Sequence, residues 1–115
     1  MMNLHEPIIV NVSFPDQESA IQISKYLLEN KLVACAQISP IESYYTWQGN
    51  FESCKEYKAS FKTVHQFWPK IEPIILQKHP YEVPEILAVP IIEVTQSYLE
   101  WMLAELGLSG KDIDV

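Results

Sequence analysis

The sequence predicts an α+β protein: a ferredoxin-like βαββαβ sandwich with an extended β-hairpin and an extra C-terminal helix. Its 115 residues, 48% of them hydrophobic, are enough for one domain with its own core but not for two, so residues 1–115 are treated as a single domain. From Glu56 to Thr63 polar and apolar residues alternate, which is typical of an antiparallel strand with one buried face. Segments whose apolar residues have helical spacing come before and after this strand in the sequence, as the βαββαβ order requires.

The first strand and the first helix are predicted at the start of the chain. Residues 8–13 form a β-type run whose alternate apolar side chains share one face. Asp16 suits a helix N-cap, because its carboxylate can accept hydrogen bonds from the free backbone N–H groups of a first turn. We expect Asn30 to end this helix in a left-handed turn. The apolar stripe of the helix is expected to comprise Ala20, Ile23, Ser24 and Leu27, widened by Ile21 and Leu28.

A long β-hairpin is predicted over residues 34–63. Its first arm is expected to consist of two extended pieces, because Pro40 interrupts it. The turn falls at Gln48 and Gly49, since glycine readily adopts the positive φ that a tight hairpin needs. The hairpin is too long for so small a sheet, and the aromatic residues at its tip need a partner surface. These residues are Tyr44, Tyr45, Trp47 and Phe51.

The second half of the chain supplies another helix and strand. Residues 66–78 have helical spacing, although Pro73 in their interior should kink the helix. A strand is predicted over residues 86–93, and Thr95 can cap a last helix. Residues 108–115 are expected to form a tail.

Composition narrows the classes of partner. With 8 basic and 15 acidic residues the net charge is −7, which argues against nucleic acid and anionic membranes, since both attract basic surfaces. The two cysteines have no zinc-finger spacing, and no apolar run is long enough to span a membrane. The first seven residues lack the basic and apolar regions of a signal peptide. We therefore expect a cytoplasmic protein with reduced thiols.

The segment before the last strand is the most informative part of the chain. Residues 78–86 read Lys-His-Pro-Tyr-Glu-Val-Pro-Glu-Ile, and the two prolines hold them extended. This segment resembles the His-Pro-Tyr-Glu-x-Pro-Glu-Ile signature of the CutA family, the divalent-cation tolerance proteins. The resemblance extends over residues 8–106, because four further motifs stand in the family's order. They are Ala34-Cys35-Ala36, Tyr45-Thr46-Trp47-Gln48-Gly49, Lys62-Thr63 and Tyr98-Leu99-Glu100-Trp101.

The resemblance implies an assembly and a metal. CutA proteins are trimers in which long hairpin strands of neighbouring subunits pair around a three-fold axis, so it implies a homotrimer. In bacterial CutA proteins copper is bound by a cysteine on the first strand and two consecutive histidines before the Pro-Tyr pair. Here Val12 stands at the cysteine position and Lys78 at the first histidine, and only His79 matches. We expect copper binding to be weaker than in members with the full set.

His79 is therefore the candidate metal ligand, since imidazole suits copper, zinc and nickel. The alternative is that its ring hydrogen-bonds to the backbone of the connecting segment. Tyr81, Glu82 and Glu85 are further candidates for a cleft, and two carboxylates beside a histidine could hold a divalent ion. On an extended segment, however, Glu82 and Glu85 should point to opposite sides.

Three functions are compatible with these residues. The first is a trimeric, cytosolic, CutA-like protein of divalent-metal (copper) tolerance with weak metal binding, which is not an enzyme. The second is a sensor like the PII signalling proteins, binding a small effector in a cleft between subunits. The third is an enzyme that uses His79 with Glu82 or Glu85 as an acid–base pair. The chain contains no arginine and no glycine-rich phosphate loop, which lowers any phosphoryl-transfer interpretation.

Overall fold

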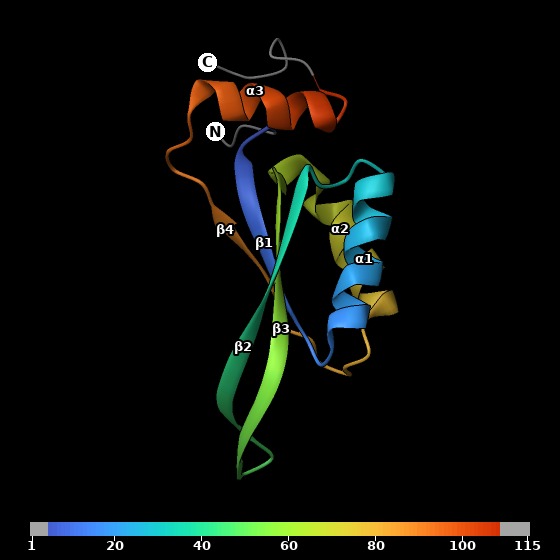
Figure 1. Cartoon of the computed structure of the whole chain (residues 1–115), viewed down its shortest axis with the longest axis vertical. Helices are drawn as coiled ribbons and strands as arrows, with labels where there is room; N and C mark the ends of the chain where they lie inside the picture. Colours follow the sequence, from blue (N-terminus) through green and yellow to red (C-terminus); the bar gives the residue numbers. More distant parts are fainter. Residues whose placement is uncertain (1–4, 109–115) are drawn as a thin grey trace.

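A computed structural model of the chain describes residues 5–108. Its four strands form one antiparallel sheet in the order β2-β3-β1-β4. The strands are β1 (Pro7–Phe14), β2 (Cys35–Trp47), β3 (Asn50–Val64) and β4 (Ile86–Pro90), and the α-helices are α1 (Gln17–Glu29), α2 (Trp68–Lys78) and α3 (Gln96–Glu105). Helices α1 and α2 cover one face of the sheet, and the β2–β3 hairpin extends well beyond them (Figure 1). The predicted ferredoxin-like order, the long hairpin and the extra helix are confirmed.

Helix α1 begins as predicted and ends differently. The Asp16 Oδ1 atom accepts a hydrogen bond of 2.7 Å from the backbone N–H of Ser19, which caps the helix. Asn30 has a φ of −91°, and Lys31 occupies the left-handed region at +56°. The prediction for Asn30 is therefore wrong by one residue, because its side-chain amide donates to the Tyr26 carbonyl at 2.8 Å and it remains in the turn. The expected stripe is buried, but its predicted flanks Ile21 and Leu28 are exposed.

The predicted break in the first arm of the hairpin is wrong. Strand β2 runs without interruption from Cys35 to Trp47, and Pro40 pairs with Tyr57 inside it. β2 is an edge strand of this sheet, where one side of the backbone has no neighbour and a missing N–H is tolerated. The turn at Gln48 and Gly49 is confirmed, with φ values of 51° and 82°.

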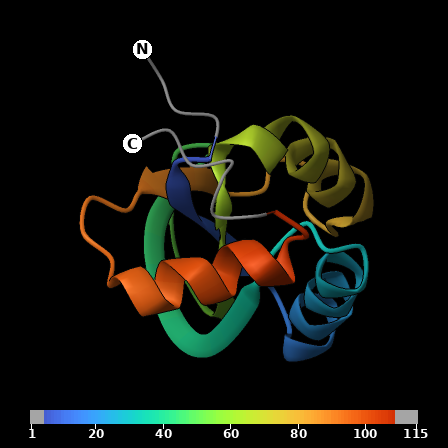
Figure 2. The same cartoon turned by 90° about the horizontal axis from the view of Figure 1, so that it is seen from above.

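The second half follows the prediction with shorter elements. A 3₁₀ turn (His65–Phe67) leads into α2, which continues through Pro73 to Lys78. β4 ends at Pro90, three residues before the predicted end at residue 93. Thr95 occupies the N-cap position of α3, but its side chain makes no capping hydrogen bond. Helix α3 crosses one end of the sheet (Figures 1 and 2), and most of the predicted tail lies outside the described residues.

Strand β3 shows how the two faces of the sheet differ. Ala59, Phe61 and Thr63 are fully buried in the core under the helices, as the alternation predicts. Residues at even positions of β3 must face the opposite side, which α1 and α2 do not cover. Glu56 is one of these residues, and yet only 6% of its surface is exposed. Something other than the two core helices must therefore cover Glu56.

A candidate binding pocket beside the hairpin

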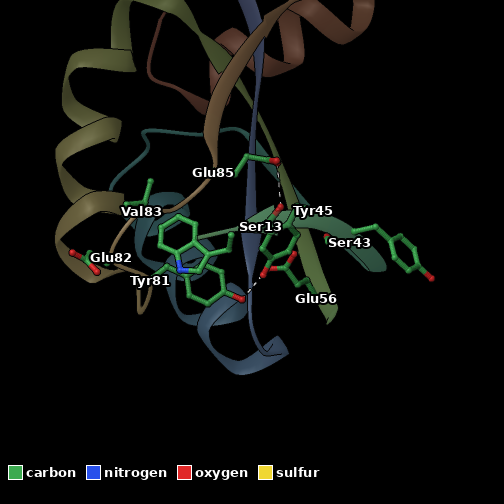
Figure 3. Close-up of a pocket in the computed structure, with 10 residues that line it drawn as sticks. Ser13, Ser43, Tyr45, Glu56, Tyr81, Glu82, Val83 and Glu85 are labelled. Atoms are coloured by element: carbon green, nitrogen blue, oxygen red, sulfur yellow. Dashed lines mark hydrogen bonds between the residues drawn. The ribbon is translucent and has the colours of Figure 1, made fainter. Parts of the chain in front are cut away.

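A pocket of about 610 Å³ lies between the β2–β3 hairpin and the connection from α2 to β4, residues 79–85. It is lined by Ser13, Ser43, Tyr44, Tyr45, Trp47, Glu56, Tyr81, Glu82, Val83 and Glu85. The lining comes from three strands and the family-like signature segment, so parts of the chain far apart in sequence meet here (Figure 3). This volume is within the range of small-molecule sites in proteins.

His79 does not line the pocket, but it is hydrogen-bonded to Ser13 and Tyr81, which do. Its Nε2 atom is 2.7 Å from the Ser13 carbonyl oxygen, so Nε2 carries the proton and donates. Its Nδ1 atom accepts a hydrogen bond of 3.0 Å from the backbone N–H of Tyr81. The ring stacks on Phe14 with centroids 4.8 Å apart, and the side chain is 8% exposed. Burial lowers the pKa of His79, which keeps the imidazole neutral.

These bonds decide what His79 can offer a metal. Both ring nitrogens are engaged with the backbone, which is the alternative role that the sequence left open. A metal ion at Nδ1 would have to displace the N–H of Tyr81. Val12 is fully buried in the core and Lys78 is exposed at the end of α2. Within residues 5–108 no three His, Cys, Asp or Glu side chains group closely enough to hold an ion.

The Tyr81 side chain covers the carboxylate of Glu56. Its hydroxyl donates to Glu56 Oε2 at 2.8 Å, which joins the connection before β4 to strand β3 (Figure 3). Burial and the hydrogen bond to Glu56 raise the pKa of Tyr81, so the phenol stays protonated. Glu56 is thus a buried carboxylate satisfied by a neutral donor.

The two carboxylates predicted on the signature segment separate as expected. Glu85 Oε2 accepts a hydrogen bond of 3.1 Å from the Ser13 hydroxyl and faces the sheet. The carboxylate of Glu82 points away from the Tyr81–Glu56 pair (Figure 3). Glu85 therefore belongs to the same polar cluster as Ser13, and Glu82 lies at the rim.

Tyr45 brings a second phenol to the pocket. Its hydroxyl is 3.6 Å from the Cys54 sulfur, and this contact raises the pKa of Tyr45 to about 12. Both Tyr45 and Tyr81 are therefore neutral at physiological pH. The charges on the lining are carboxylates alone, because the lining contains three glutamates and no lysine or histidine.

The sequence predicted Tyr81, Glu82 and Glu85 as residues of a cleft, and all three line this pocket. It did not predict Glu56 and Ser13. Both missed residues lie on strand faces that alternate with the buried ones, and the alternation leaves such a face either uncovered or covered by a partner. The sequence did contain a signal for Glu56. It is a carboxylate within the hairpin, and the segment that precedes the edge strand β4 comes close to the hairpin in space. To recognise this signal from the sequence, one must know the register in which the strands pair.

Comparison with known proteins places the chain in a family. Residues 8–105 match the family described as CutA1 divalent ion tolerance protein. This chain belongs to the CutA1 family. The divalent-cation tolerance protein CutA of Pyrococcus horikoshii is 39% identical over 98 residues, covering 85% of this chain and 96% of that protein. Its counterpart in Thermus thermophilus is 38% identical over 100 residues, covering 86% and 97%.

Solved structures agree with the fold. The chain superposes on the periplasmic divalent cation tolerance protein CutA from Archaeoglobus fulgidus with a TM-score of 0.84 and 31% identity, covering 87% of this chain and 98% of that chain. CutA1 from Shewanella sp. SIB1 gives a TM-score of 0.83 at 36% identity, covering 88% and 95%. The family description names tolerance to divalent ions and no reaction. No helix among residues 5–108 has the length and apolar character to cross a membrane.

Proposed function

We propose that this CutA1-family member acts in divalent-cation tolerance as a cytoplasmic homotrimer, and that it responds through a bound ligand without catalysing a reaction. The observation that carries the proposal is the pocket, because the family-like segment 79–85 forms one of its walls. The relatives named as divalent-cation tolerance proteins match over nearly their whole length, which supports the same role here.

The trimer is supported by what the single chain leaves uncovered. Four aromatic residues of the hairpin tip are exposed, and Phe51 retains 75% of its surface. Apolar side chains are also exposed on the edge strand β4, at Leu87 and Val89. Both surfaces lie at sheet edges, where strands of another subunit can pair. A homotrimer would cover part of these surfaces and leave the pocket open between the hairpin tip and a neighbouring subunit.

Copper binding is proposed to be weak and to depend on His79. Val12 and Lys78 remove two of the family's donors, and losing a thiolate particularly disfavours Cu(I). Binding at His79 must also break its bond to the Tyr81 N–H. A titration calorimetry experiment should therefore show no tight copper site, and the residual heat should disappear in His79→Ala. A tight site that persists in His79→Ala would contradict the placement of the ligand.

A second candidate function is a small-molecule sensor of the PII type. It is favoured by the volume and mixed lining of the pocket, which suit an organic molecule better than a single ion. The two candidates separate in a thermal-shift screen, because a ligand that binds only the folded form raises the melting temperature. A shift with copper or another divalent ion alone favours metal tolerance by direct binding, and a shift with organic ligands favours the sensor. A monomer in sedimentation experiments would contradict the trimer in both.

A further inference from the structure

We propose that the pocket beside the hairpin binds a small organic cation with an ammonium head group. The inference names the ligand class for the sensor function proposed above and rests on it. It follows from the combination of carboxylates, aromatic rings and missing basic residues in one pocket.

The charge of the pocket favours a cation. Glu56 and Glu85 are acceptors for the hydroxyls of Tyr81 and Ser13, so both carboxylates are held in place by neutral donors. Glu56 is only 6% exposed, and a buried carboxylate is costly unless its charge is compensated. A ligand cation supplies that compensation, since the lining itself contributes no positive side chain.

The walls select an organic cation over a metal ion. Tyr45, Trp47 and Tyr81 line the pocket with aromatic side chains, and the face of such a ring attracts a cation. A hard metal ion gains nothing comparable there, because it requires several oxygen ligands in place of its water. Within residues 5–108 no cluster of three metal-ligating carboxylates, histidines or cysteines exists. A single ion would also leave most of the 610 Å³ empty.

The neutral phenol groups of Tyr45 and Tyr81 add to the specificity of the pocket for its ligand. The raised pKa values of Tyr45, about 12, and Tyr81 keep both hydroxyls protonated, so they can bond polar groups of a ligand without adding charge. Val83 is 67% exposed at the rim and offers an apolar contact for the body of the ligand. An ammonium head between carboxylates, with an apolar or hydroxyl-bearing body, matches these features.

The experiment compares choline with 3,3-dimethylbutan-1-ol, its uncharged carbon isostere, by calorimetry on the full chain in its native assembly. The two probes have nearly the same shape and differ in the charge of the head group. We expect choline to bind at least about tenfold tighter than the isostere. Glu85→Gln should weaken choline binding by about two- to fivefold and leave the weak binding of the isostere unchanged.

Matched variants keep the test falsifiable. Glu29→Gln makes the same change in net charge on the exposed end of α1, away from the pocket lining, and should retain choline binding. Because Glu56→Gln alters a buried residue and can impair folding, Glu85, which is exposed, serves as the primary site. Equal binding of both probes, or choline binding that is unchanged in Glu85→Gln, would overturn the inference.

The outcome also separates this inference from the proposed function. If an intact trimer does not bind choline, for example because another subunit fills the pocket, the organic-cation inference is overturned and the tolerance role stands. The same conclusion follows if a divalent ion alone shifts the melting temperature. A chain that sediments as a monomer but binds choline refutes the trimer and retains the ligand class. The calorimetric and sedimentation measurements therefore report on the two proposals independently.

Discussion

Strand β3 runs through two regions of the molecule that obey the same alternation and differ in what covers them. Near its end, Phe61 is fully buried in the hydrophobic core. Near its start, Phe51 lies at the hairpin tip and is 75% exposed. Between them Glu56 is buried by Tyr81, a residue from the connection before β4. The chain itself therefore covers the first region, whereas in the second it leaves large aromatic side chains exposed.

The largest difference is expected from truncating the two phenylalanines. Phe61→Ala leaves a cavity in the core and should lower the free energy of unfolding by about 3–5 kcal/mol. Phe51→Ala should leave the fold of the subunit intact, because the ring is 75% exposed and its stacking partner, Tyr44, is itself exposed. Urea denaturation at a protein concentration where the assembly is dissociated measures both. Comparable losses would show that the hairpin tip is part of the subunit's own core.

A substitution at the hairpin tip should shift the equilibrium between monomer and trimer. Trp47→Ala is expected to weaken the trimer by about 2 kcal/mol or more, since large aromatic residues often dominate interfaces. Sedimentation over a range of concentrations measures the change. Ile21→Ala, an apolar truncation on the exposed side of α1, is the control and should leave assembly unchanged. If Trp47→Ala leaves both assembly and melting temperature unaltered, the tip is not an interface.

At the boundary between the two regions, Tyr81→Phe isolates one hydrogen bond. Removing the hydroxyl leaves the buried Glu56 carboxylate without its 2.8 Å donor, which should cost about 1–3 kcal/mol of unfolding free energy. Tyr44→Phe removes a similar bond of 2.9 Å to Glu42, but on an exposed surface, and should change stability little. Denaturation of the two variants in parallel measures the difference. Equal effects would mean that water in the pocket satisfies Glu56 as well as Tyr81 does.

The burial of His79 predicts a dependence of stability on pH. Its folded pKa lies below the unfolded value of about 6.5, so the unfolded chain binds the proton first as the pH falls. The contribution of His79 is complete above about pH 6.5 and should be lost as the pH falls through the lower, folded pKa. Melting temperatures from pH 7 to pH 5 in wild type and His79→Gln measure it. The variant should be less stable at pH 7 and show a flatter profile.

Controls for this profile lie in the groups around the ring. The hydrogen bond to the Ser13 backbone and the charge of Glu56 both act against this lowering of the His79 pKa. Stacked Phe14 and the backbone of Ser13 and Tyr81 carry no titrating charge. His65→Gln, on the 3₁₀ turn before α2, should retain the wild-type profile. An unchanged slope in His79→Gln would mean that another group governs the acid response.

The sequence predicted the region that the chain completes by itself far better than the other. The stripe of α1, the alternation of β3 and the cap at Asp16 depend on local periodicity and short-range bonds, and all are confirmed. Pro40 was misjudged because the effect of a proline in a strand depends on whether that strand lies at the edge of the sheet. The burial of Glu56 was not predicted, because it depends on which segment folds over the hairpin. The sequence left two roles open for His79, a metal ligand or a ring that hydrogen-bonds to the backbone. Only its neighbours in space distinguish backbone bonding from a free imidazole.

The smallest predicted effect tests whether the two regions also differ in local backbone strain. Lys31 ends α1 with a φ of 56°, and Gln48 begins the hairpin turn with a φ of 51°. Left-handed backbone costs a side-chain-bearing residue about 1–2 kcal/mol, of which the extra entropy of an unfolded glycine returns a part. Lys31→Gly and Gln48→Gly should therefore each stabilise the fold by roughly 0.5–1 kcal/mol, measured by urea denaturation. Asn30→Gly is the control, because Asn30 has a φ of −91° and loses its bond to Tyr26, so it should destabilise. A gain at Lys31 alone would indicate that the hairpin tip is not held in its turn until another subunit packs against it.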